Sequence, residues 1–179
     1  MASASKDAAI FQPNLTPGGY TVQVGDAGAG AGTVIAEIYD ATPTGALSAT
    51  TPRLVNVSVL KQIAAGSPLI AGFVIAGPTA KTVLIRAIGP GLASFGVYDT
   101  MADPQLALFQ GASPIAENDN WGGAAPLISA GNSVGAFAIT NPDSKDAMLL
   151  LTLAPGNYSA QVSGVTGGGT ALVEVYELP

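Results

Sequence analysis

The sequence predicts an all-β protein, an antiparallel β-sandwich with an N-terminal partial repeat of the same strands. Glycine (23) and proline (13) are abundant among the 179 residues, and both disfavour long helices. Only 10% of the residues are charged, against about 25% in typical soluble domains, and the mean hydropathy is +0.42. Disorder requires low hydropathy with high charge, so a packed core of short strands fits this composition better.

A long internal repeat organises the chain, because residues 5–40 and 144–177 are similar from end to end. The run Ser-Lys-Asp-Ala at 5–8 returns at 144–147, the turn Pro-Gly-x-Tyr at 17–20 returns at 155–158, and Glu-x-Tyr at 37–39 returns at 174–176. These matches lie 139, 138 and 137 residues apart, so single-residue gaps in loops explain the drift. Self-similarity at a fixed spacing is typical of proteins built from repeated units.

The repeat predicts two parts. Residues 1–46 are the C-terminal strands of a preceding unit or a strand-donating segment, and residues 47–179 are a complete β-sandwich module. Two explanations fit: a tandem array of units cut out of phase, or a single domain that needs both copies. The sequence leaves both open.

Strands are predicted where β-branched and large apolar residues alternate with small or polar ones. In the two copies, which we expect to be equivalent hairpins, these are Ala8–Gln12, Tyr20–Val24 and Thr33–Tyr39, then Ala147–Leu153, Tyr158–Ser163 and Ala171–Tyr176. Between the copies we predict strands at Leu54–Val59, Leu69–Ile75, Lys81–Ile88, Gln105–Phe109, Pro114–Ala116 and Ser133–Ile139. Leu92–Phe95 is expected to form one short helical turn, and no helix longer than two turns is expected.

The composition excludes several kinds of chemistry. The chain has no histidine and no cysteine, so it lacks an imidazole base and a thiolate nucleophile, and we expect no catalytic residue. A net charge of −6 argues against a nucleic-acid partner. No window reaches the roughly 18 uninterrupted apolar residues of a membrane-spanning helix, so membrane insertion is not expected. Residues 1–7 do not resemble a signal peptide, so an exported protein would be represented here by a mature form or an excised piece.

Several stretches resemble known bacterial modules. The sequences RLVNVS (53–58), AGFVI (71–75) and VLIRAIGP (83–90) resemble a module repeated in large exported proteins of Verrucomicrobia-type bacteria. The sequences DPQLALF (103–109), IAENDNW (115–121), PGNY (155–158) and QVSG (161–164) are similar to pre-peptidase C-terminal (PPC-like) domains. The resemblance implies a secreted, non-catalytic β-sandwich appended to, or tiled along, surface proteins. Some PPC-like domains bind calcium or polymeric ligands.

The acidic loop before the only tryptophan is a candidate calcium site. Calcium takes about six to eight oxygen ligands, and carboxylates and amides could supply several. The candidate ligands are Asp103, Glu117, Asn118 and Asp119. The alternative is a series of Asx turns in which these side chains accept hydrogen bonds from nearby backbone N–H groups. Apart from calcium, no cofactor is expected.

The same loop is a candidate polysaccharide site. Trp121 beside two glycines could form an exposed platform for a sugar ring, with Asn118 and Asn120 adding polar contacts. The alternative is that Trp121 fills one end of the sandwich, because a tryptophan buries a large area.

Charged residues within the strands have structural interpretations. Lys6-Asp7 and Lys145-Asp146 are either inter-module salt bridges or the solvated starts of strands. Arg86 lies in an otherwise apolar strand. It is either a buried ion-pair partner of Asp103 or Glu174, or an outward-facing residue.

We therefore expect an extracellular or cell-surface structural and adhesive repeat module. Its partners are neighbouring copies of the same module or chain, and strand addition would join them head to tail into a filament. The residues expected to mediate assembly are the apolar ones of the first copy: Ala8, Ile10, Tyr20, Val22, Val24, Val34 and Ile38. A module that binds carbohydrate or another matrix polymer, assisted by calcium, is the alternative.

Overall fold

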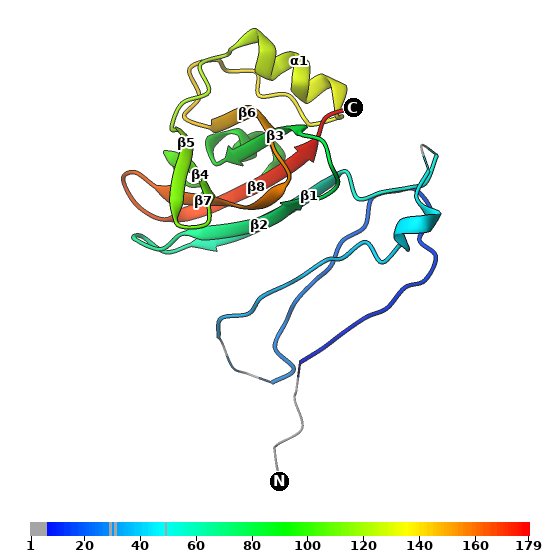
Figure 1. Ribbon diagram of the computed structural model, residues 1–179. Helices are drawn as coiled ribbons and strands as arrows, with labels where there is room; N and C mark the ends of the chain where they lie inside the picture. The colour runs from blue at the N-terminus through cyan, green and yellow to red at the C-terminus, as the bar shows by residue number, and fades with distance from the viewer. Residues whose placement is uncertain (1–6, 29, 31, 49) are drawn as a thin grey trace. The chain divides into compact units, whose positions relative to one another are not determined.

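The computed structural model describes residues 7–28, 30, 32–48 and 50–179 (Figure 1). The chain divides into two units, Met1–Leu54 and Val55–Pro179.

The second unit holds eight strands. They are β1 (Asn56–Ile63), β2 (Leu69–Ile75), β3 (Lys81–Ile88), β4 (Pro104–Gln110), β5 (Ser113–Asn118), β6 (Ala147–Leu153), β7 (Gly156–Gly164) and β8 (Gly169–Glu177). The helical elements of this unit are η2 (Pro90–Phe95), which includes the expected helical turn, and α1 (Ala125–Ser133).

The strands form two antiparallel four-stranded sheets, in the orders β1-β8-β3-β6 and β2-β7-β4-β5. The main core lies between them and contains fully buried side chains from both sheets, such as Ile85, Leu106 and Val162. The predicted antiparallel β-sandwich is therefore confirmed. The central strand β3 is buried on both faces, which explains its nearly continuous apolar run.

The nine-residue helix α1 was not expected from the sequence, and the prediction of no helix longer than two turns is wrong. A proline stands in its first turn, where the missing N–H costs nothing, and Ala130 is buried against Leu84 and Tyr176 of the first sheet. Figure 1 shows α1 lying over β6 and β3. The predicted strand Ser133–Ile139 is also wrong, because the chain turns at Gly135, whose φ is 70°.

The first unit differs from the prediction. None of its described residues lies in a strand, every described residue from 7 to 40 is exposed, and its one helical element is η1 (Thr44–Ala46). The strands predicted at Ala8–Gln12, Tyr20–Val24 and Thr33–Tyr39 are therefore corrected to extended or irregular chain. The reason lies in how the equivalent strands pair in the second copy.

The second copy is not a hairpin either. β6 pairs with β3, β7 pairs with β2 and β4, and β8 pairs with β1 and β3, so none of the three pairs with another. The chain crosses from one sheet to the other between β6 and β7, and crosses back before β8. Every ladder of the repeated segment depends on strands outside it, so an isolated copy has no ladder to form.

Candidate functional site

The feature with the clearest functional content is the duplicated strand set. We call β6, β7 and β8 the C-terminal set, residues 8–39 the N-terminal set, and β1–β5 the scaffold. In the C-terminal set, alternate side chains point between the sheets and join the main core; these are Ala147, Leu149, Tyr158, Ala160, Val162, Ala171, Val173 and Val175. They make the set an integral part of the sandwich.

The expected assembly residues of the N-terminal set occupy the corresponding positions. Ala8 and Ile10 match Ala147 and Leu149. Tyr20, Val22 and Val24 match the inward side chains of β7, and Val34 and Ile38 match two inward side chains of β8. All seven are exposed, Ile10 to 90%. The segment thus presents to solvent the side-chain pattern that its twin buries.

One local contact is the same in both copies. The Tyr158 hydroxyl donates a hydrogen bond to the Ala154 carbonyl oxygen at 2.9 Å, and the Tyr20 hydroxyl donates to the Thr16 carbonyl oxygen at 2.7 Å. Each spans four residues across the Pro-Gly turn. Tyr158 also stacks on Phe73 of β2, with ring centroids 5.6 Å apart. The turn therefore forms without the partner strands.

A second local contact is also duplicated. The Tyr176 hydroxyl donates to Glu174 Oε1 at 2.7 Å, and the Tyr39 hydroxyl donates to Glu37 Oε1 at 3.0 Å. In the buried copy, desolvation and then the bond to Glu174 raise the pKa of Tyr176. In the exposed copy, the bond to Glu37 and then its charge raise the pKa of Tyr39.

In the second copy, the repeated glutamate also makes a contact with a residue far away in the sequence. Arg86 of β3 stands directly opposite Glu174 of β8, and its Nε lies 2.9 Å from Glu174 Oε2, with both side chains buried. Arg86 also donates to the Phe137 carbonyl oxygen at 2.7 Å and lies over the Phe137 ring, 4.3 Å from its centroid. Arg86 Nε and Glu174 Oε2 are close but do not form a well-aligned hydrogen bond, so the attraction between them is mainly that of opposite charges. The ion-pair interpretation of Arg86, with Glu174 as its partner, is correct.

Asp146, directly before β6, is a buried anchor that the sequence reasoning missed. Its carboxylate accepts hydrogen bonds from Gly89 N–H at 2.7 Å, from Gly91 N–H at 3.1 Å and from the Ser144 hydroxyl at 2.5 Å. A side chain at Gly91 would collide with Asp146, since a Cβ there would lie 2.9 Å from Oδ2. The signal that could have found it is the Gly-Pro-Gly turn at 89–91, which presents unpaired N–H groups.

Neither interpretation of the Lys-Asp pairs holds for the second copy. Lys145 is exposed while Asp146 is fully buried and bonded to backbone groups, so the two side chains diverge. Lys6 lies outside the described residues.

The proposed calcium ligands are not brought together. No group of three or more acidic side chains suited to a metal occurs among the described residues, so Asp103, Glu117 and Asp119 do not converge. Glu117 stands opposite Ala107 and Asn118 opposite Leu106, so these two neighbours point to opposite faces of their sheet. Asn118 accepts from Met148 N–H at 2.9 Å and donates to the Asn120 carbonyl oxygen at 3.0 Å. Asn118 therefore bonds backbone groups, but the N–H that it accepts from belongs to β6, 30 residues away, rather than to an Asx turn.

Trp121 is not an exposed platform. It is 5% exposed and packs with Ile88, Leu92 and Met148 in a cluster at one face of the first sheet. The expected sugar-binding group of Trp121, Asn118 and Asn120 is therefore corrected: the ring is buried, as in the alternative, but on the face of the first sheet that points away from the main core rather than within the sandwich.

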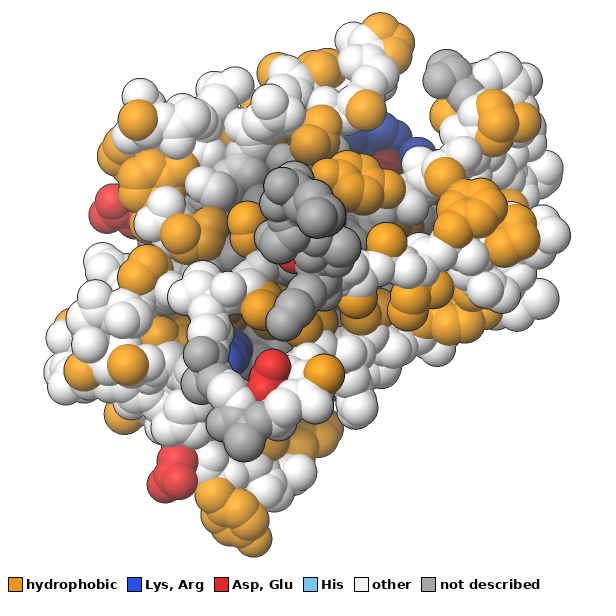
Figure 2. Space-filling model, turned by 90° about the horizontal axis from the view of Figure 1, so that it is seen from below, with side chains coloured by type: hydrophobic (Ala, Val, Ile, Leu, Met, Phe, Trp, Pro, Cys, Tyr) orange, Lys and Arg blue, Asp and Glu red, His pale blue; other side chains and the backbone are white. Residues whose placement is uncertain are grey.

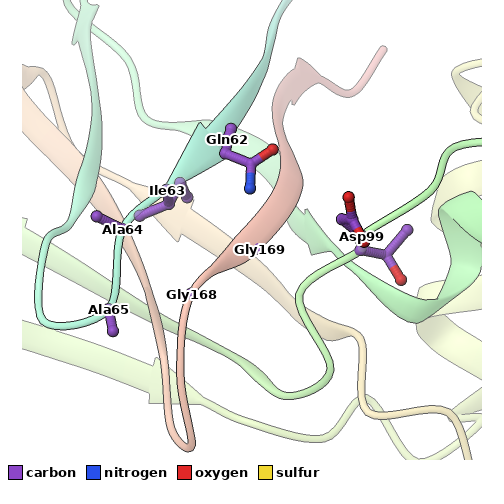
Figure 3. Close-up of a pocket in the computed structure, with 8 residues that line it drawn as sticks. Gln62, Ile63, Ala64, Ala65, Asp99, Gly168 and Gly169 are labelled. Atoms are coloured by element: carbon purple, nitrogen blue, oxygen red, sulfur yellow. The ribbon is translucent and has the colours of Figure 1, made fainter.

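An open hollow of about 500 Å³ lies at the turns between strands, shown in Figure 3. Gly168, Gly169, Ala64 and Ala65 contribute mostly backbone, and Asp99 is the one carboxylate of its lining. A single carboxylate without a second titratable group gives no acid and base pair for catalysis. No helix in the described parts of the chain is long and apolar enough to span a membrane.

No protein-family model and no curated protein matches the chain. Among solved structures it is similar to the pre-peptidase C-terminal domain of a collagenase from Bacillus anthracis. The identity is 15% over 68% of this chain and 89% of that one, with a TM-score of 0.42. It is also similar to a family GH115 4-O-methyl-α-glucuronidase with specificity for decorated arabinogalactans, with 16% identity over 67% of this chain, 14% of that chain, and a TM-score of 0.33. At these similarities the fold class rests on the strand pairing described above.

Proposed function

We propose that this chain is a non-catalytic structural module of an extracellular or cell-surface repeat protein, and that its N-terminal set supplies strands to a neighbouring copy of the module. The observation that carries the proposal is the exposure of core-type side chains, Ile10, Val22 and Val34 among them, in a segment whose twin is fully integrated in a sandwich.

Strand addition is the mode of association that such a segment favours. A chain that lacks its own ladder can bond its backbone N–H and C=O groups to an exposed sheet edge, while alternate side chains enter the core. Donor and acceptor are different surfaces, so the contact need not close and can extend head to tail. Figure 2 shows many exposed hydrophobic side chains and few charged ones on the face seen there, which limits electrostatic repulsion between copies.

A non-catalytic role is supported by the chemistry of the chain. It has neither histidine nor cysteine, and no group of three or more acidic side chains that could hold a metal ion occurs among the residues that the structure describes. A polysaccharide-binding role lacks support, because Trp121, on which it depended, is buried.

Sedimentation velocity across a wide range of protein concentration tests the proposal. The wild-type chain should form larger species as its concentration rises. A variant with Val22→Asp and Val34→Asp should remain monomeric. A matched control with Ile128→Asp and Val165→Asp, exposed positions of the second unit, should still assemble. A monomeric wild type at every concentration, or equal assembly of all three proteins, contradicts the proposal.

A further inference from the structure

We infer that the chain carries two alternative strand sets for one scaffold: the N-terminal set fits the places of β6, β7 and β8 on β1–β5 of the same chain. Residues 5–143 would then be a circular permutant of the module in residues 56–177. This inference goes beyond assembly between copies, because donor and acceptor are one molecule.

The correspondence of side chains is the first argument. The inward positions of β7 would be filled by Tyr20, Val22 and Val24, and those of β8 by Val34, Ala36 and Ile38. Both duplicated tyrosine contacts are already in place, at 2.7 Å for Tyr20 and 3.0 Å for Tyr39. Much of the local geometry needed for the sandwich therefore precedes docking.

The polar contacts of the scaffold are matched as well. Arg86 needs a carboxylate opposite it, and Glu37 stands at the position of Glu174. The N–H groups of Gly89 and Gly91 need an acceptor, and Asp7 stands at the position of Asp146. If the N-terminal set replaced the C-terminal set on the scaffold, Arg86 would still face a carboxylate, and the two glycine N–H groups would still have an acceptor.

The connection between the sets and the scaffold permits the exchange. The end of β8 lies beside the start of β1, since Glu177 N–H bonds the Val55 carbonyl oxygen at 2.9 Å. Asp40 matches Glu177, so residues 41–54 would close as a loop between two adjacent strand ends. Loop closure depends only weakly on length, and a loop of this size is tolerated.

The fit of the N-terminal set is poorer, which explains why the C-terminal set holds the scaffold. Ala9 stands in place of the buried Met148, and Gln12 in place of Leu151. Pro13 adds a residue to the strand equivalent to β6. That strand is at a sheet edge, where a proline is tolerated.

Engineered disulfides in the full-length chain test the inference, because the chain has no cysteine of its own. Leu60 stands opposite Leu172, and Ile35 matches Leu172. The pair Leu60→Cys with Leu172→Cys reports the C-terminal set, and Leu60→Cys with Ile35→Cys reports the N-terminal set. Leu60→Cys with Ala36→Cys is the control, since a shift of one residue turns the side chain to the other face.

The N-terminal pair and its control are compared in chains that also carry Ala171→Asp, which places a charge in the core and disables the C-terminal set. The pair with Ile35→Cys should then form an intrachain disulfide at least about tenfold faster than the control pair, because register fixes which face meets Leu60. Adding Val34→Asp, the matching change in the N-terminal set, should abolish this preference.

Equal rates for the two pairs would overturn the inference, since an unfolded chain shows no register preference. Disulfides formed only between chains would also overturn it, while leaving strand donation to a neighbouring copy in force. The sedimentation experiment on the wild-type chain is independent of both outcomes.

Discussion

Residues 144–177 and residues 5–40 share one repeated sequence pattern in two different settings. In the second copy the strands belong to two sheets and bury alternate side chains, whereas the described residues of the first copy are exposed and form no ladder. Both copies have the same two local hydrogen bonds: Tyr176 and Tyr39 each bond a glutamate two residues away, and Tyr158 and Tyr20 each bond a carbonyl oxygen four residues away. Contacts with β1–β4 are found in the second copy. The comparison teaches that local sequence sets the turns, while partner strands decide whether a segment becomes a strand.

The largest difference between the copies is expected at their shared glutamate. Glu174→Gln leaves the buried Arg86 without its charge partner, so the free energy of unfolding should fall by about 3–5 kcal/mol. Glu37→Gln, the same change at an exposed site, should stay within about 0.5 kcal/mol of wild type. Urea unfolding followed by tryptophan fluorescence measures both. Equal losses would mean that the copies share one environment.

The aspartate that the two copies share is also buried in one copy and exposed in the other. Asp146→Ala leaves the Gly89 and Gly91 N–H groups without an acceptor, which should cost about 3 kcal/mol because bonds to charged acceptors are strong. Asp7→Ala serves as the matched control and should change stability by no more than about 0.5 kcal/mol. Thermal unfolding of both variants measures the difference, and a destabilised Asp7→Ala protein would refute this distinction.

The duplicated tyrosine hydrogen bond across the Pro-Gly turn separates local from tertiary contributions. Tyr158→Phe removes one hydrogen bond in a buried ring, so unfolding should become easier by about 1 kcal/mol. Tyr20→Phe removes the same bond from an exposed ring and should have no measurable effect on global unfolding. Chemical denaturation of the two variants tests this. A larger effect from Tyr20→Phe would show that the first copy contributes to the cooperative fold.

The smallest expected effect concerns alkaline pH. The pKa of Tyr176 is raised in the folded protein, first by burial and then by Glu174. The folded state therefore keeps the phenol proton after the unfolded chain begins to lose it. The contribution of Tyr176 to the free energy of unfolding is therefore complete below pH 10.0, the ordinary pKa of tyrosine, and is lost as the pH rises further. Tyr176→Phe should flatten this decline. Tyr39→Phe should not, because the pKa of Tyr39 is raised mainly by Glu37, through a contact two residues apart that does not need the folded sandwich. Unfolding curves at increasing pH measure the slopes, and parallel slopes in wild type and Tyr176→Phe would contradict the assignment.

The sequence predicted the parts of the fold that depend on alternation within one segment. The strands at Leu69–Ile75 and Lys81–Ile88 were placed at their observed bounds, and the partner of Arg86 was among the two expected. The parts that depend on distant segments were not predicted. The helix Ala125–Ser133 is stabilised by packing on the first sheet, and Asp146 acquires its role only beside the Gly-Pro-Gly turn.

The candidate site shows the same limit. Trp121 has the residue type and neighbours of a sugar platform, but its burial depends on Ile88 and Met148, which are remote in sequence. Two of the segments predicted as strands in the first copy, Tyr20–Val24 and Thr33–Tyr39, are rich in β-branched and aromatic residues, yet β propensity alone does not form a ladder. In contrast, the repeat alone aligns each expected assembly residue with a twin, and these twins lie in the main core.

Amide hydrogen exchange on the wild-type chain, at a concentration where it is monomeric, measures the protection of both copies in one sample. We predict strong protection across residues 147–177 and exchange close to the unprotected rate across residues 8–39, because amides without a ladder are open to solvent. Comparable protection of the two segments in the monomer would contradict the account, since it would show that the first copy forms its strands without the partners that its twin requires.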